Sequence, residues 1–323
     1  MFDTISAWMS GHPVAANLGI LIASLVIVIW AADLAVLGIS SYARKFGISD
    51  YLIGFLVLGI GTSLPEFVSA MMGGLVGQSG IVLGTLIGSG IVTLTFVLGT
   101  MALAGKGIVF RARLLEKTKW LTLLLISAPL ALVLDGRLSR IDGAILIALF
   151  LAYTGLLWQR EGTLGKLREV RIVRFWRDVA VFLGSLAALL LGARWLVFSS
   201  IRLAQEFEVS PFLIAITVIA VGASLPDLTV ELRAIWRGHT AIGFGNVLGG
   251  VIAEMTLIIG LVALTIPIEI APSTLAFAGA FFLGTVVLLL WWTRKGSLSW
   301  PQGAALIALW LAFTLAQIVI ELV

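Results

Sequence analysis

The segment Gly61-Thr62-Ser63-Leu64-Pro65-Glu66 returns 161 residues later as Gly222-Ala223-Ser224-Leu225-Pro226-Asp227. Each copy lies inside an apolar stretch long enough to cross a bilayer, which takes roughly 20 residues as a helix. Glycine weakens a helix and proline lacks an amide hydrogen, so we expect each helix to break and restart here. The spacing of Ser63 to Glu66, and of Ser224 to Asp227, also predicts a capping box at each restart.

The carboxylate in each copy indicates function. A carboxylate at mid-bilayer is costly to bury and marks a functional site by default. Broken backbone at that depth is tolerated only where it faces protein or a water-filled cavity. Glu66 and Asp227 also lie near the start of a restarted helix, where the helix dipole favours the ionised carboxylate. Two breaks at matching positions therefore predict one shared site that binds a cation.

The repeat extends well beyond these two segments. The same shift of 161 aligns three pairs of glycines, Gly84 with Gly245, Gly88 with Gly249 and Gly99 with Gly260. A shift of 160 aligns Leu138-Ser139 with Leu298-Ser299 and Gly143-Ala144 with Gly303-Ala304. A match over most of both halves predicts an internally duplicated chain.

Composition places the duplicated chain in a membrane. Of its 323 residues, 60% are hydrophobic and 12% are charged, and the mean hydropathy is +1.12. Soluble domains carry roughly 25% charged residues. We expect ten transmembrane helices, at 15–39, 51–76, 80–104, 119–134, 141–158, 178–201, 211–236, 241–266, 273–293 and 302–322.

Five expected spans in each half put the second half into the membrane from the opposite side. The predicted fold is an all-α integral membrane protein with ten transmembrane helices in two inverted five-helix repeats and broken helices at the midplane. The first repeat covers residues 1–158, a basic cytoplasmic linker covers 159–177 and the second repeat covers 178–323. Transporters are commonly built this way, with the site between the repeats. A duplicated scaffold without transport activity is the alternative, which the buried carboxylates disfavour.

The basic residues predict the orientation. With the N-terminus outside, the inner loops hold 17 Lys and Arg and the outer loops hold three. Lys and Arg concentrate in cytoplasmic loops, so we expect both termini outside a prokaryotic inner or plasma membrane and the loop from Arg160 to Arg177 inside. The same loops account for the formal charge of +4 without a nucleic-acid partner.

Several classes of protein are disfavoured by residues that the chain lacks. With no Cys and two His, it offers no disulfide, thiolate metal site or His-rich metal cluster. It has no P-loop and no room for a nucleotide domain, and no nucleophile or His base accompanies the carboxylates, so an enzyme is the least favoured class. We expect no cofactor, nucleotide or obligatory protein partner, only membrane lipid and transported cations. A channel-like or sensory membrane protein is the alternative from a different class, but paired broken helices suit alternating access better.

A third carboxylate follows in the next span. Glu254 lies 27 residues beyond Asp227, and the same step from Glu66 leads to Thr93. Ser89 lies one helical turn before Thr93 and so shares its face. Small residues let membrane helices approach closely, and if these helices meet at the centre, the three carboxylates converge. Carboxylates, hydroxyls and carbonyls offer the oxygen ligands that Ca2+ and Na+ prefer.

The two G-[TA]-S-L-P-[ED] segments, each followed by G-x-[VL]-[IL]-G, resemble the alpha repeats of the calcium/cation antiporter superfamily, and the chain resembles prokaryotic sodium/calcium exchangers over nearly its whole length. The resemblance implies exchange of Na+ for Ca2+ by alternating access, with four ion sites at the midplane. It implies that Glu66 and Asp227 are the main Ca2+ carboxylates. The further ligands that it implies are the side chains of Thr62, Ser63, Ser89, Ser224 and Glu254 and the carbonyls of Gly59 and Ala220. We add Thr93, which stands where the family usually has Asn, to these candidates.

The chain departs from the family pattern mainly in the second repeat. Asp227 stands where the family usually has Glu, and Glu254 stands where it usually has Asp. Ala223 and Gly250 replace residues that normally present hydroxyl groups to Na+. The loss of these oxygens keeps a second function open, a Ca2+/H+ or other divalent cation/H+ antiporter.

Three further charged residues lie within the expected spans. Asp33 and Arg194 occupy equivalent positions in the two halves, and we expect structural pairing for them rather than a role in ion transfer. Glu231 lies one turn beyond Asp227, where the first repeat has Ala70. We favour a pair between Glu231 and a nearby arginine over a relay carboxylate on the inner path.

Overall fold

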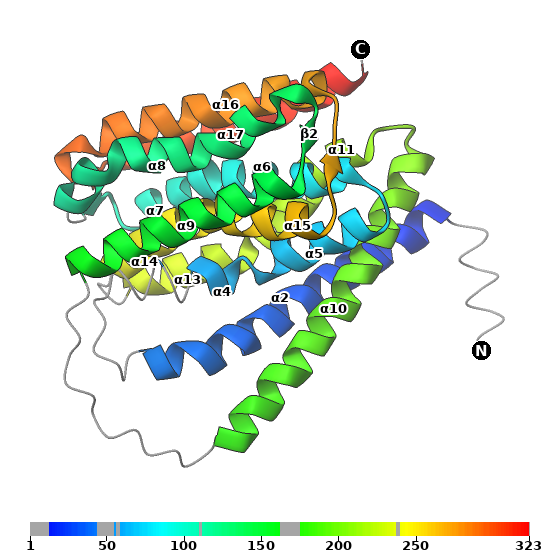
Figure 1. Cartoon of the computed structure of the whole chain (residues 1–323), viewed down its shortest axis with the longest axis horizontal. Helices are drawn as coiled ribbons and strands as arrows, with labels where there is room; N and C mark the ends of the chain where they lie inside the picture. Colours follow the sequence, from blue (N-terminus) through cyan, green and yellow to red (C-terminus); the bar gives the residue numbers. More distant parts are fainter. Residues whose placement is uncertain are drawn as a thin grey trace.

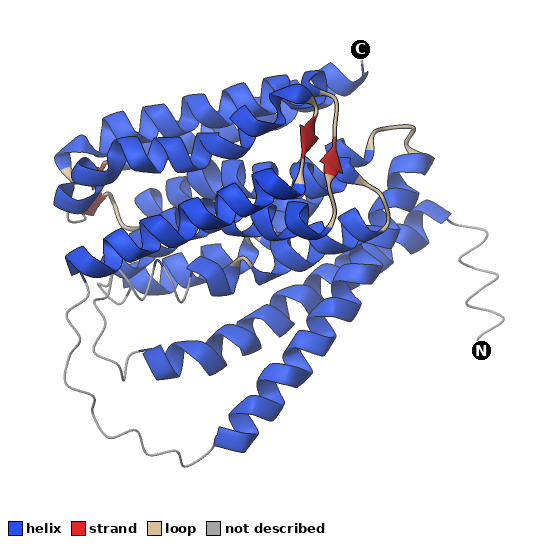
Figure 2. Cartoon of the chain, viewed as in Figure 1, coloured by secondary structure: helices blue, strands red, loops and turns tan. Residues whose placement is uncertain are grey.

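The structure, a computed structural model, describes residues 13–43, 55, 59–109, 112–161, 175–236 and 240–322. Almost all of these residues are helical, and the strands among them are four pieces of two residues each (Figure 2). The prediction of an all-α chain is therefore confirmed for the described residues.

The helices follow the expected spans closely. The first half contains α2 (Pro13–Ala43), α4 (Gly59–Thr62), α5 (Leu64–Leu75), α6 (Ser79–Val92), η3 (Thr93–Val97), α7 (Leu98–Ala104), β1 (Ile108–Val109), α8 (Ala112–Leu132), η4 (Val133–Asp135), β2 (Arg137–Leu138) and α9 (Arg140–Glu161). The second half contains α10 (Phe175–Glu206), α11 (Pro211–Ile214), η5 (Ala215–Ile219), α12 (Ala220–Ala223), α13 (Leu225–Trp236), α14 (Thr240–Ile252), η6 (Ala253–Ile258), α15 (Ile259–Thr265), β3 (Ile268–Glu269), α16 (Pro272–Trp292), η7 (Thr293–Lys295), β4 (Ser297–Leu298) and α17 (Trp300–Leu322). Three of these elements, η3, η5 and η6, are single π-helical segments, which the sequence did not predict.

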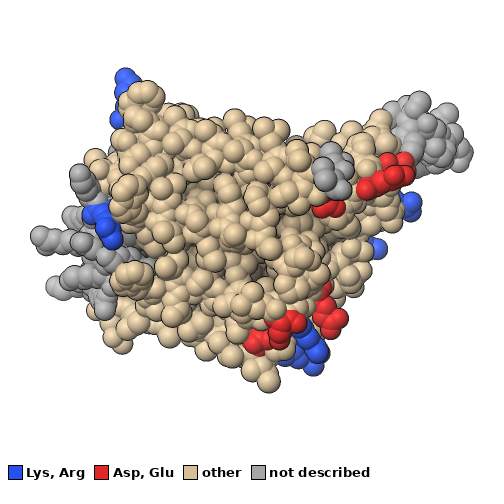
Figure 3. All heavy atoms as spheres, turned by 90° about the horizontal axis from the view of Figure 1, so that it is seen from above, with Lys and Arg blue, Asp and Glu red and all other residues tan. Residues whose placement is uncertain are grey.

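Six helical stretches are long and apolar enough to cross a membrane. They are Val14–Ala31, Ser79–Ala104, Arg140–Gln159, Gly243–Thr265, Pro272–Trp292 and Trp300–Glu321. Because charged groups avoid hydrocarbon, the position of the surface charges tests this assignment. Figure 3 shows them gathered at the two ends of the long axis, with a broad uncharged band between. The chain is thus a multi-pass membrane protein.

The two stretches that enclose the centre are the most buried. In Ser79–Ala104, 94% of residues are buried, and in Gly243–Thr265, 83%. Only 28% of Val14–Ala31 and 22% of Trp300–Glu321 are buried. Figure 1 shows α2 and α10 side by side on one flank and α8, α16 and α17 on the other. The stretches from α6 to α7 and from α14 to α15 therefore form the core around which the other helices pack.

The short strands join the two halves reciprocally. β1 pairs with β4 in antiparallel fashion, with Ile108 opposite Leu298. β2 pairs with β3, with Leu138 opposite Ile268. A shift of 160 residues converts one strand pair into the other, so each half contributes equivalent strands to both junctions.

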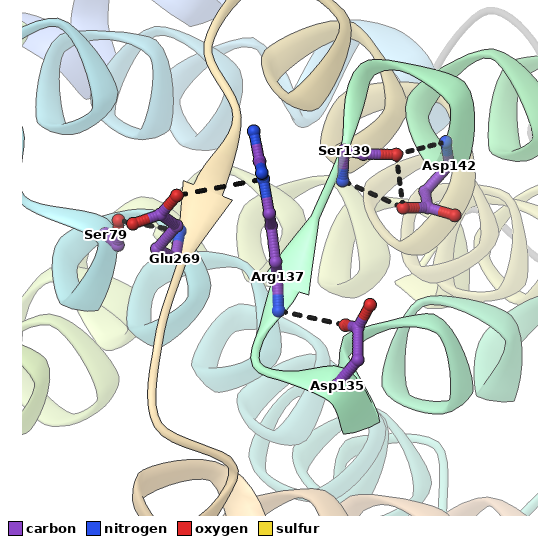
Figure 4. A network of polar contacts seen from close by, with 6 residues as sticks. All are labelled: Ser79, Asp135, Arg137, Ser139, Asp142 and Glu269. Carbon is purple, nitrogen blue, oxygen red and sulfur yellow. Dashed lines mark hydrogen bonds and ion pairs between the residues drawn. The ribbon is translucent and has the colours of Figure 1, made fainter.

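Figure 4 shows the polar contacts at the junction of β2 and β3. The Arg137 guanidinium lies 3.7 Å from the Glu269 carboxylate, and both side chains are exposed. At the start of α9, the Ser139 amide donates to Asp142 at 2.8 Å while the Asp142 amide donates to the Ser139 hydroxyl at 3.3 Å. This reciprocal pair is a capping box at the surface, where a helix begins.

Glycines bring the two core stretches against the broken helices. A Cβ at Gly88 would lie 2.8 Å from the carbonyl oxygen of Ile216, and one at Gly249 would lie 2.3 Å from that of Phe55. Real Cβ atoms essentially never approach backbone so closely, so only glycine fits at either position. The two contacts are equivalent under the shift of 161 residues. They place the backbone of each broken helix directly against the core stretch of the other half.

Both predicted breaks occur. Ser63 separates α4 from α5, and Ser224 separates α12 from α13. The predicted capping box at Ser63 is wrong, because its side chain makes no capping bond. Its hydroxyl instead donates to the Gly59 carbonyl at 2.9 Å, and the Ser224 hydroxyl donates in the same way to Ala220. In an interior without water, a serine hydroxyl bonds the carbonyl four residues before it, because that acceptor is always within reach.

Candidate cation-binding site

Three carboxylates from three different elements meet at the centre of the molecule. Glu66 lies in the first turn of α5, Asp227 in the first turn of α13, and Glu254 in η6. One oxygen from each carboxylate lies within 4.8 Å of the other two. All three side chains are buried, with at most 2% of their surface exposed. The structure thus brings together the carboxylates that the sequence singled out.

Local backbone geometry turns these side chains inward. Pro65 lacks an amide hydrogen, so the turn before Glu66 leaves the Gly61 carbonyl without its helical donor. The break lets α5 start with a new direction, and Glu66 stands at its N-terminal end. Glu254 lies in a π-helical segment, a wide turn that is frequent at functional sites and changes which face a side chain occupies.

Two serine hydroxyls connect the carboxylates. Ser89 on α6 lies 3.3 Å from Oε1 of Glu66 and 3.0 Å from Oε1 of Glu254. The Ser63 hydroxyl lies 3.2 Å from the same Glu254 oxygen. Ser224 reaches the Ser89 hydroxyl at 3.4 Å. The predicted hydroxyl ligands Ser63, Ser89 and Ser224 therefore form a continuous network around the carboxylate cluster.

The remaining predicted ligands also lie at this centre. The carbonyls of Gly59 and Ala220 accept bonds from the hydroxyls of Ser63 and Ser224. Thr93 is buried at the start of η3, and the hydroxyls of Thr62 and Thr93 lie beside Asp227. The structure therefore places all ten predicted residues in one region, and their role as ligands stays a prediction.

Asn246 on α14 joins a fourth carboxylate to the cluster. Its amide nitrogen lies 3.3 Å from Oδ1 of Asp227 and 2.8 Å from Oε1 of Glu231. Its oxygen accepts a bond from the Thr62 hydroxyl at 3.4 Å. The preferred pairing of Glu231 with an arginine is not seen among the described residues, because Glu231 is fully buried on Asn246. The sequence signal was present, since Glu231 shares a helix face with Asp227, but nothing in the sequence fixed Asn246 as its partner.

The site is rich in acceptors and poor in cations. One oxygen each of Glu66, Glu231 and Glu254 is buried without a hydrogen-bond partner. Every Lys and Arg side chain in the described part of the chain is exposed. Buried carboxylates need a compensating charge, and clustered carboxylates with hydroxyls and carbonyls are the ligands that hard cations prefer. The residues present therefore suit a hard cation such as Ca2+.

The expected pair of Asp33 and Arg194 is not resolved. The Asp33 side chain lies outside the described residues, and the Arg194 side chain is exposed. This pairing stays a prediction.

Comparison with known proteins agrees with the site. The family model described as sodium/calcium exchanger protein matches residues 16–159 and 178–319. An inner membrane protein of Escherichia coli, YrbG, is 31% identical over 85% of this chain and 89% of its own length. The sodium/calcium exchanger MaX1 of Methanosarcina acetivorans is 26% identical over 93% of this chain and 98% of its own. A solved structure of the sodium-calcium exchanger NCX_Mj superposes with a TM-score of 0.69 at 27% identity, over 93% of this chain and 97% of that one. The chain belongs to the sodium/calcium exchanger protein family.

Proposed function

We propose that this antiporter moves Ca2+ in exchange for Na+ by alternating access, with Glu66, Asp227 and Glu254 holding the ion. The observation that carries the proposal is the approach of three buried carboxylates to within 4.8 Å without a basic partner among the described residues. Relatives named sodium/calcium exchangers over nearly the whole chain support this choice of ions.

Charge balance explains how the cluster drives exchange. Crossing a low-dielectric slab with an uncompensated buried charge is costly, so the site reorients only when it is loaded with cations. One Ca2+ neutralises two of the three carboxylates, and its departure requires Na+ to replace it. The hydroxyls of Ser63, Ser89 and Ser224 supply neutral oxygens in both loaded states.

We further propose ten membrane spans in two inverted repeats, with both termini outside. The reciprocal strand pairs and the paired glycine contacts support equivalent halves. In Figure 1 the start of α2 and the end of α17 lie at the same end of the molecule. The end of α9 and the start of α10, which flank the basic linker, lie at the opposite end (Figure 1).

The test replaces each main carboxylate by its amide. Glu66→Gln and Asp227→Asn keep the shape but remove the charge, so we expect each to abolish Ca2+ flux into proteoliposomes while the protein stays folded. Glu269→Gln is the matched control, because it removes an exposed carboxylate outside the site. Near-normal Ca2+ flux in both site variants would refute the central site, and size-exclusion profiles check folding.

A further inference from the structure

Glu231 is a buried carboxylate that the proposed exchange does not use. It lies on α13 one turn beyond Asp227, and none of its surface is exposed. One of its oxygens accepts from Asn246 at 2.8 Å, and the other has no hydrogen-bond partner. The equivalent position in the first half is Ala70, also fully buried, so the fourth carboxylate is a feature of the second half alone.

Asn246 holds Glu231 and Asp227 side by side. An amide nitrogen carries two hydrogens, and here one is directed to each carboxylate. The Thr62 hydroxyl donates to the oxygen of the same amide, which fixes the direction of its nitrogen. Carboxylate oxygens of both residues therefore lie within reach of a single small ion next to the central cluster.

The charges around this position do not balance. Asn246 is neutral, Asp227 carries the same sign as Glu231, and the described Lys and Arg side chains are all exposed. A Ca2+ ion held by Glu66, Asp227 and Glu254 leaves one negative charge in the cluster, and Glu231 adds another. A buried charge without a partner is strongly destabilising, so the loaded site lacks positive charge at Glu231.

We propose that Glu231 and Asp227 bind an alkali-metal cation alongside Ca2+. Asp227 is shared with the central ion, so the position offers one unshared carboxylate, which one monovalent charge balances. Its donors are all oxygens, which suits a hard cation. The inference rests on the proposed function, and it makes the Ca2+-loaded state of this chain depend on a second, monovalent ion.

Exchange of external radioactive Ca2+ for internal Ca2+ isolates this state, because the carrier then crosses the membrane only while loaded with Ca2+. The full-length protein is measured in liposomes with the same salt on both sides, using Na+, K+ or Li+ chloride against choline chloride at constant ionic strength. The parent should show exchange that rises saturably with one of the alkali metals over choline. Glu231→Gln, which keeps an acceptor for Asn246 but removes the charge, should lose this stimulation. The readout is the ratio of rates in the two salts, so a lower absolute rate does not affect it.

Two controls sharpen the result. Glu269→Gln removes an exposed carboxylate and should respond to alkali metals as the parent does. Glu231→Asp keeps the charge on a shorter side chain and should respond with a weaker apparent affinity. If Glu231→Gln is inactive in every salt, Glu231→Asp decides, because an unchanged alkali-metal affinity in that variant overturns the inference.

Failure of the inference is distinct from failure of the proposed function. Equal Ca2+ exchange by the parent in choline and in every alkali-metal salt overturns the second ion but leaves Ca2+ transport standing. A dependence on pH in place of alkali metal also overturns it and identifies the proton as the missing charge. Undiminished stimulation in Glu231→Gln excludes Glu231 as the ligand. A parent that exchanges no Ca2+ in any salt contradicts the proposed function itself.

Discussion

Single residues distinguish the two sides of the carboxylate cluster. On the first-repeat side the chain keeps the hydroxyls of Thr62 and Ser89, whereas on the second-repeat side Ala223 and Gly250 present none. Space for a hydroxyl exists at Gly250, because the nearest atom to an added Cβ is the Ser63 hydroxyl at 3.6 Å. The missing oxygens therefore reflect the choice of residue at Gly250 rather than crowding.

Restoring these oxygens should change the coupling ion. Na+ needs several well-placed oxygens, so Ala223→Thr combined with Gly250→Ser should strengthen Na+-driven Ca2+ flux relative to pH-driven flux. Both gradients are imposed separately on the parent and on the double variant in proteoliposomes. If the double variant still transports Ca2+ and the ratio of the two fluxes does not move, these positions do not control coupling.

Elements could be predicted from the sequence wherever a local pattern or a repeat specified them. The helices and both breaks follow from apolar length and from the repeated Gly-Pro segments, and the spacing of Glu254 from Asp227 anticipated the carboxylate cluster. The π-helical segments at η3 and η6 could not be predicted, because their extra residue per turn is imposed by packing against other helices. The capping box at Ser63 failed for a related reason, since a spacing rule derived from helix ends in water does not hold in a dry interior. The Asn246 contacts depend on helices brought together from different parts of the chain, which no local pattern encodes.

Contacts between elements should fail when a methyl group is added at the closest of them. Gly249→Ala places a Cβ 2.3 Å from the Phe55 carbonyl oxygen, so α14 must move away from the broken helix. Overpacking of this kind costs roughly 1–3 kcal/mol, and we expect a lower unfolding temperature in detergent together with weaker Ca2+ transport. Gly284→Ala on α16 is the matched control, because nothing lies within 4 Å of its added Cβ. Equal unfolding temperatures for the two variants would mean that the close contact is not maintained.

For the whole molecule, the orientation in the membrane follows from charge. The proposed topology puts 17 Lys and Arg inside and three outside, which the positive-inside rule favours strongly. The chain has no cysteine, so single cysteines report on sidedness without interference.

A cysteine at Gly165 should resist a membrane-impermeant thiol reagent in sealed cells and react after permeabilisation. A cysteine at Asp135, beside the exposed junction of β2 and β3, should react in sealed cells. Labelling of the Gly165 site from outside would reverse the proposed orientation. Ca2+ transport by each variant, measured in parallel, shows that the labelled protein is native.

The reciprocal strand pairs also determine the order in which the chain is completed during synthesis. β1 is made early, but its partner β4 begins only at Ser297, so nearly the whole chain must emerge from the ribosome before β1 is paired. Until then the first half holds an unsatisfied strand edge and carboxylates that lack their neighbour Glu254. A nascent chain stopped anywhere before residue 297 is therefore an unfinished molecule rather than a working half. Duplication has given this protein two similar halves that mature as one unit.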